Sequence, residues 1–155
     1  MSHKVKSSEL NGKGLYFVAF KVFLRKGNKL LVLKDSFGRW DLPGGRMLPE
    51  EFGKPIDKII ARKIKEELGG VKYKLGQPVV FMRHERQESV SGGKLKVQIF
   101  AIGYEAKMTG GEIKLSKRHT EMSWEDIKTF PPEKKFKGGW LRGVKEYLAL
   151  ANSNS

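Results

Sequence analysis

The sequence predicts an α/β fold in which helices cover a mixed β-sheet. Two observations predict it. Stretches rich in β-branched and aromatic residues, such as 15–24 and 94–104, are separated by turns, whereas residues 55–68 repeat apolar side chains at three- and four-residue steps. A length of 155 residues suits one domain. We therefore expect a flexible lead-in over 1–13 and a single domain over 14–151.

The first β region predicts a hairpin over residues 15–34. Residues 15–24 form the first strand, Gly27 and Asn28 lie at the centre of a turn, and residues 30–34 return as the second strand. A short extended piece follows from Trp40 and ends in a Pro-Gly-Gly break at Gly45.

The helix over 55–68 has one apolar stripe. Pro55 suits its first position, where a missing N–H costs nothing, and Gly69 favours its end. The stripe is made of Ile56, Ile59, Ile60, Ile64 and Leu68.

The second β region is expected to hold strands over 78–84 and 94–104, followed by a turn over 108–111. A short strand is expected over 122–124, and an amphipathic terminal helix over 140–151.

The composition restricts the function. A charge of +14, from 31 Lys and Arg against 17 Asp and Glu, favours a polyanionic partner such as a nucleotide or a nucleic acid. The absence of cysteine excludes disulfides, thiol catalysis and thiolate metal sites. We find no secretion signal and no apolar stretch long enough to cross a membrane, so we expect a cytoplasmic protein without a membrane partner.

The helix carries charged residues where apolar ones are expected. At about 100° per residue, Glu67 and Lys63 fall within the apolar arc, and Glu66 falls on its edge. A charge facing a core is costly unless it is paired or bound to a cation. Either Glu67 pairs with Lys63 or Arg62, or the helix lines a site where Glu66 and Glu67 bind Mg²⁺ or Mn²⁺.

The glycine segment ahead of the helix favours the second interpretation. Gly44 and Gly45 allow close approach of a ligand to the backbone, and Arg46 directly after them can hold a phosphate. Arg62, four residues before Glu66, is expected to orient that carboxylate.

These motifs together resemble the Nudix hydrolase family, whose box reads Gly-x5-Glu-x7-Arg-Glu-U-x-Glu-Glu-x-Gly-U, where U is a bulky apolar residue. Residues 40–45 are similar to the lead-in to the box, and its second half is matched by Arg62, Ile64, Glu66, Glu67 and Gly69. The resemblance implies an α/β/α sandwich and hydrolysis of a nucleoside diphosphate linked to another group. It also implies a divalent cation held by Glu66 and Glu67, with Glu121 and the Gly45 carbonyl as further ligands.

The box has three departures. Lys63 stands where the family has a glutamate, and Gly70 stands at the final apolar position. The stretch between Gly45 and Arg62 is about three residues too long. Counting forward from Gly45 places the first box glutamate at Glu51, whereas counting back from Arg62 places it at Lys54.

The lost glutamate requires another base. His119 and Glu121, which precede Trp124, are the candidates. His119 is similar to the base of the GDP-mannose hydrolase branch, which also lacks the glutamate after the box arginine, and His84 lies near a second histidine of that branch.

Three functions remain open. The first is a hydrolase of a nucleotide or nucleotide-sugar, in which Glu66, Glu67, His119 and Glu121 act on a substrate. The substrate is expected to bind His84 and residues of the glycine segment and the helix, namely Gly44, Gly45, Arg46, Arg62 and Lys63. The second is a Nudix-like module that binds a nucleotide or RNA without cleaving it, with Lys63 in the place of the metal. The third is a pyrophosphohydrolase acting on the 5′ end of a transcript. A dimer is compatible with each.

Overall fold

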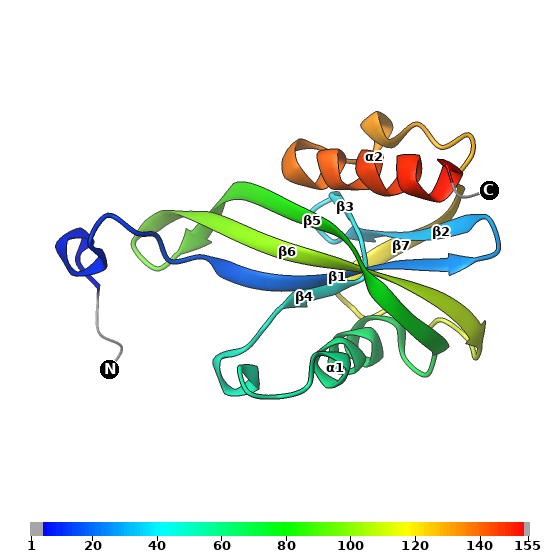
Figure 1. Ribbon diagram of the computed structural model, residues 1–155, viewed down its shortest axis with the longest axis horizontal. Coiled ribbons are helices and arrows are strands. Elements are labelled where there is room, and N and C mark those ends of the chain that lie inside the picture. Colours follow the sequence, from blue (N-terminus) through cyan, green and yellow to red (C-terminus); the bar gives the residue numbers. More distant parts are fainter. Residues whose placement is uncertain (1–4, 154–155) are drawn as a thin grey trace.

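The protein is built around a seven-stranded mixed sheet with one long helix on each side (Figure 1). The structure is a computed structural model and describes residues 5–153. The strands are β1 (Phe17–Lys26), β2 (Lys29–Asp35), β3 (Trp40–Asp41), β4 (Gly44–Arg46), β5 (Lys72–Val90), β6 (Gly93–Gly110) and β7 (His119–Asp126). The helices are α1 (Ile56–Leu68) and α2 (Gly138–Ser153), with 3₁₀ turns η1 (Ser7–Leu10), η2 (Pro49–Glu51) and η3 (Pro132–Lys134).

Strand pairing at the centre of the sheet determines the position of the glycine segment, Gly44 and Gly45. Strand β1 runs parallel to β6 along most of its length, and it pairs with β2 only next to the turn, through Arg25 and Lys26. Farther from the turn, β4 pairs with this edge of β1 in place of β2, and Gly45 of β4 lies opposite Phe20 of β1. The predicted hairpin is therefore confirmed, and its early divergence brings Gly44 and Gly45 to the middle of the sheet.

Two apolar cores hold the layers together. The core under α1 unites Ile60, Ile64 and Leu68 with Phe20 and Leu31 of the sheet. The core under α2 includes the stacked rings of Phe23 and Tyr147, whose centroids are 4.1 Å apart. The predicted fold class, an α/β/α sandwich with a mixed sheet between helices, is confirmed.

Two local expectations were wrong. Ile56 lies outside the buried stripe, with 40% of its surface exposed, because the first turn of α1 projects past the apolar core. The turn expected over 108–111 is largely strand. Strand β5 begins at Lys72, six residues before the expected start, so Met108 and Gly110 have partners in the β5–β6 ladder.

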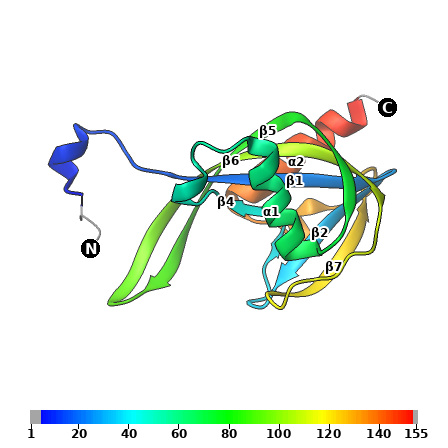
Figure 2. The same ribbon diagram turned by 90° about the horizontal axis from the view of Figure 1, so that it is seen from below.

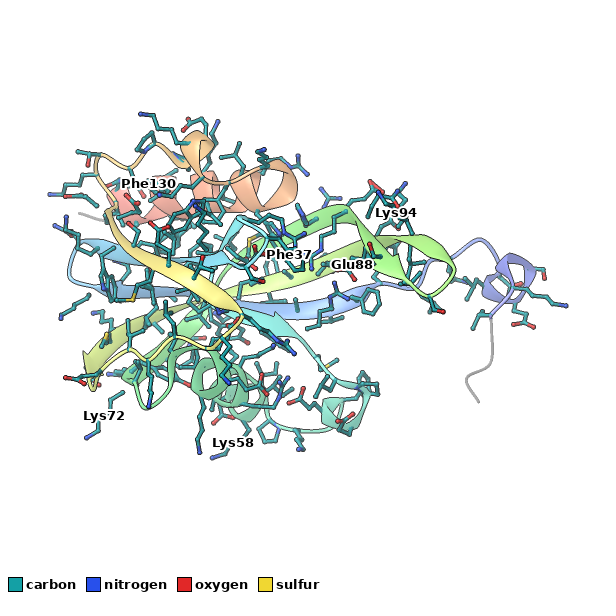
Figure 3. The ribbon with its side chains drawn as sticks, turned by 180° about the vertical axis from the view of Figure 1, so that it is seen from behind. Phe37, Lys58, Lys72, Glu88, Lys94 and Phe130 are labelled. Carbon is teal, nitrogen blue, oxygen red and sulfur yellow. The ribbon has the colours of Figure 1, made fainter. Side chains whose placement is uncertain are left out.

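The β5–β6 hairpin extends beyond the sandwich as an arm (Figure 2). Glu88, labelled on this arm in Figure 3, pairs with Arg46 of β4 and with Arg86 of its own strand. The arm is thereby joined to Arg46, which directly follows Gly44 and Gly45. In the described part of the chain, no helix is long and apolar enough to cross a membrane.

Candidate functional site

The glycine segment and the last turn of α1 are joined by a short hydrogen bond. The N–H of Gly44 donates to Oε1 of Glu67 at 2.6 Å. Gly44 has a φ of 129°, and a Cβ atom there would overlap the carbonyl oxygen of Phe20. Only glycine permits this close crossing of β1 and β4. The crossing therefore aims a backbone N–H at the carboxylate.

The carboxylate of Glu67 is largely shielded from solvent. Only 14% of its side chain is exposed. Burial raises the pKa of Glu67 to about 7, although the Gly44 N–H and the charge of Lys21 act in the opposite direction. At neutral pH this carboxyl group can therefore both hold and release a proton. The prediction that Glu67 lies inside the apolar arc of the helix is confirmed.

His119 faces Glu67 from the start of β7. Its Nε2 lies 3.5 Å from Oε2 of Glu67, and its Nδ1 lies 3.0 Å from Oγ of Ser116, which orients the ring. Burial lowers the pKa of His119, so the imidazole is neutral at pH 7 and able to accept a proton. The β2–β7 ladder has a bulge between Lys34 and Asp35, next to the point where Asp35 pairs with His119.

Glu67 and His119 open on a cavity of about 360 Å³, which we call the carboxylate cavity. Glu66 lies at its edge with half of its side chain exposed. Burial alone would raise the pKa of Glu66, but the hydrogen bond from Arg62 and the charge of Lys63 lower it. The cavity is lined by Lys63, Glu66, Glu67, Ser116, Lys117, Arg118 and His119.

Arg62 has two acidic partners. It donates to Glu66 at 3.0 Å, as the i,i+4 spacing predicts, and it also donates to Glu51 through Nε at 2.5 Å and through its terminal nitrogen at 2.7 Å. The side chain of Glu51 is 3% exposed, and the hydrogen bond from Arg62 lowers its pKa to about 2. Glu51 is thus the acid that meets the helix, which agrees with counting forward from Gly45 and places the extra residues between Glu51 and Arg62.

A second cavity, of about 310 Å³, adjoins the first and is strongly basic. We call it the basic cavity. The sequence analysis expected Arg46, Arg62 and Lys63 here, and all three line it together with Gly44 and Gly45.

The sequence analysis missed four further residues of the basic cavity. These are three cations and one acid from four separate segments: Lys21, Arg86, Arg118 and Asp41. A lysine within the apolar strand 15–24 was the available signal for Lys21, which is 5% exposed and pairs with Asp41 at 2.9 Å.

His84 and Glu121 line neither of these two cavities. His84 is in the middle of β5, stacked on Trp140 at 4.5 Å, and burial lowers its pKa to about 4. Its Nδ1 is buried without a hydrogen-bond partner. Glu121 is more than half exposed, with its carboxylate 3.7 Å from Lys34. The structure therefore brings together Glu66, Glu67 and His119, but not Glu121.

Clusters of three or more metal-ligating side chains are absent from the described residues. Within residues 5–153, no three His, Asp or Glu side chains converge closely enough to hold a metal ion. Gly45, whose carbonyl was expected as a further ligand, is paired with Phe20 in the sheet. Of the predicted carboxylate ligands, Glu66 and Glu67 share the carboxylate cavity.

The chain has the fold of the Nudix hydrolases. The MutT protein of Methanosarcina mazei superposes with a TM-score of 0.65 at 22% identity, covering 88% of this chain and 95% of that one. An ADP-ribose pyrophosphatase from Streptococcus suis gives 0.63 at 13% identity, covering 91% and 96%. An Ap4A hydrolase of C. elegans gives 0.61 at 17%, covering 88% and 98%. No family model and no curated protein matches the sequence, and these low identities establish the fold alone.

Proposed function

We propose that the protein is a Nudix-type hydrolase that cleaves a nucleoside diphosphate linked to another group, such as a nucleotide or a nucleotide-sugar. The observation that carries the proposal is the Glu67–His119 pair, which has little exposure to solvent and lies beside a cavity lined by six cations. The structurally similar proteins support the substrate class, since they include an ADP-ribose pyrophosphatase and an Ap4A hydrolase.

The basic cavity supplies the binding energy for phosphates. Lys and Arg side chains with low exposure attract phosphate oxygens more strongly than surface charges do, because water screens them less. Arg46 and Arg62 are held in place by Glu88 and Glu51. The cations are therefore positioned before the ligand arrives, which lowers the entropy cost of binding.

The Glu67–His119 pair supplies a proton acceptor. Neutral His119, oriented by Ser116, takes a proton from water, and Glu67 lies close enough to stabilise the resulting imidazolium. Glu66 and Glu67 also fit a single Mg²⁺ or Mn²⁺ ion, because such ions are usually held by one or two carboxylates together with substrate phosphates. A bound ion would neutralise charge on the diphosphate.

The proposal is tested by assaying nucleoside diphosphate derivatives for hydrolysis with Mg²⁺ or Mn²⁺. We expect Glu67→Gln to lower the rate by about 100-fold or more, because the His119 base would lose the carboxylate that stabilises its imidazolium, and a positioned general base contributes about 10² to 10⁴. Glu112→Gln, which makes the same change at an exposed site, is the control and should keep the parent rate. Equal rates in the two variants would exclude the mechanism, and binding without cleavage by the parent protein would identify a Nudix-fold binding module instead.

A further inference from the structure

The position of Lys63 carries an inference about how phosphates bind. Lys63 lines both the carboxylate cavity and the basic cavity, so its side chain lies where the two meet. Only 19% of the side chain is exposed. An anion that spans the two cavities must therefore pass this ammonium group.

The end of the Lys63 side chain packs against the backbone of Gly45. A Cβ atom on Gly45 would overlap the Cε atom of Lys63 and lie 2.8 Å from its Nζ. Gly45 does not have a positive φ, so its backbone conformation is open to alanine. An alanine at position 45 would therefore push the flexible end of the Lys63 side chain out of its present position.

The charge of Lys63 is only partly neutralised by its neighbour. Its Nζ lies 3.5 Å from Glu66, a long ion pair, and the same carboxylate already accepts a 3.0 Å hydrogen bond from Arg62. An ammonium group has three N–H donors. Lys63 therefore keeps donors for a further oxygen acceptor in the cavities.

From this arrangement we infer that Lys63 is a built-in cation that holds the diphosphate of the ligand, so that binding does not require a divalent metal ion. The inference rests on the proposed function, since it concerns the same site, but it separates two steps. Binding depends on Lys63 and the cations of the basic cavity, whereas cleavage depends on Glu67 and on any ion held beside it. A cation fixed at this position does part of the charge neutralisation that bound metal ions supply.

Binding measured in EDTA tests the inference. Inorganic pyrophosphate and the nucleoside diphosphates ADP, GDP, CDP and UDP are titrated calorimetrically into the parent protein and into Lys63→Gln. We expect the parent to bind at least one of them in EDTA, and Lys63→Gln to bind about tenfold more weakly. The matched control is Lys58→Gln on the same helix, because Lys58 is exposed and lines neither cavity (Figure 3). Its affinity should equal that of the parent.

A second variant tests the contact between Lys63 and Gly45 without changing any charge. Gly45→Ala should weaken binding in EDTA by about the same factor, and the double variant should be no weaker than either single one, because all three disturb one contact. Additive losses would show that Gly45 acts independently of Lys63. Thermal unfolding of each variant checks that the fold is retained.

The outcomes separate the inference from the proposed function. Binding that appears only with Mg²⁺, and is equal in the parent and Lys63→Gln, would overturn the inference and leave the hydrolase proposal standing. No binding of any probe with or without Mg²⁺, together with no hydrolysis of the wider substrate panel, would overturn both.

Discussion

Two acidic side chains with little exposure, Glu51 beside helix α1 and Glu67 on the helix itself, have opposite surroundings. Glu51 is almost fully buried and accepts two hydrogen bonds from Arg62, which hold its pKa near 2. Glu67 faces a histidine and one backbone N–H, and burial raises its pKa to about 7. Although Glu67 lies only five residues after Arg62 in the chain, the guanidinium donates instead to Glu51 and Glu66. The comparison shows that one arginine decides which buried acid is structural and which is free to exchange a proton.

The largest expected effect comes from breaking the structural pair. Glu51→Gln leaves the guanidinium of Arg62 without its buried partner, and we expect the free energy of unfolding to fall by about 3 kcal/mol. Urea denaturation measures this loss. Glu50→Gln, at the exposed neighbouring position, should change stability by less than about 0.5 kcal/mol. Equal stabilities of the two variants would show that the pair contributes nothing.

The same pair predicts how stability depends on pH. The folded-state pKa of Glu51 lies below its ordinary value of 4.5, so its ionised form stabilises the fold. That contribution is complete above pH 4.5 and is lost as the pH falls toward 2. Urea denaturation from about pH 6 down to about pH 3 should show a shallower decline in Glu51→Gln than in the parent. Parallel declines would contradict the assignment.

The reactive acid should behave differently when its charge is removed. Glu67→Gln keeps an acceptor for the Gly44 N–H and removes a buried charge that no arginine pairs within residues 5–153. In EDTA at about pH 8, we expect its unfolding free energy to equal or exceed that of the parent, within about 1 kcal/mol. A loss as large as that of Glu51→Gln would mean that both acids are structural.

The contrast also shows what sequence can predict. Local periodicity predicts helix α1 and its inward-facing Glu67, because both follow from residues close together in the chain. The position of the first box glutamate could not be chosen between 51 and 54, because a loop of irregular shape has no period. The basic cavity was only partly predictable, since Lys21, Arg86 and Arg118 meet through pairings of distant strands. The excess of cationic residues is visible in the sequence, but the folded sheet determines which of them lie together in the basic cavity.

The smallest effect is expected at Glu121, the acid that the structure sets apart. Its carboxylate is more than half exposed and 3.7 Å from Lys34, and exposed ion pairs contribute little. We expect Glu121→Gln to change stability by less than about 0.5 kcal/mol and to lower hydrolysis far less than Glu67→Gln does. Steady-state rates of the two variants on one substrate decide this. A loss at Glu121 as large as that at Glu67 would mean that β7 moves on ligand binding and carries this acid into the carboxylate cavity.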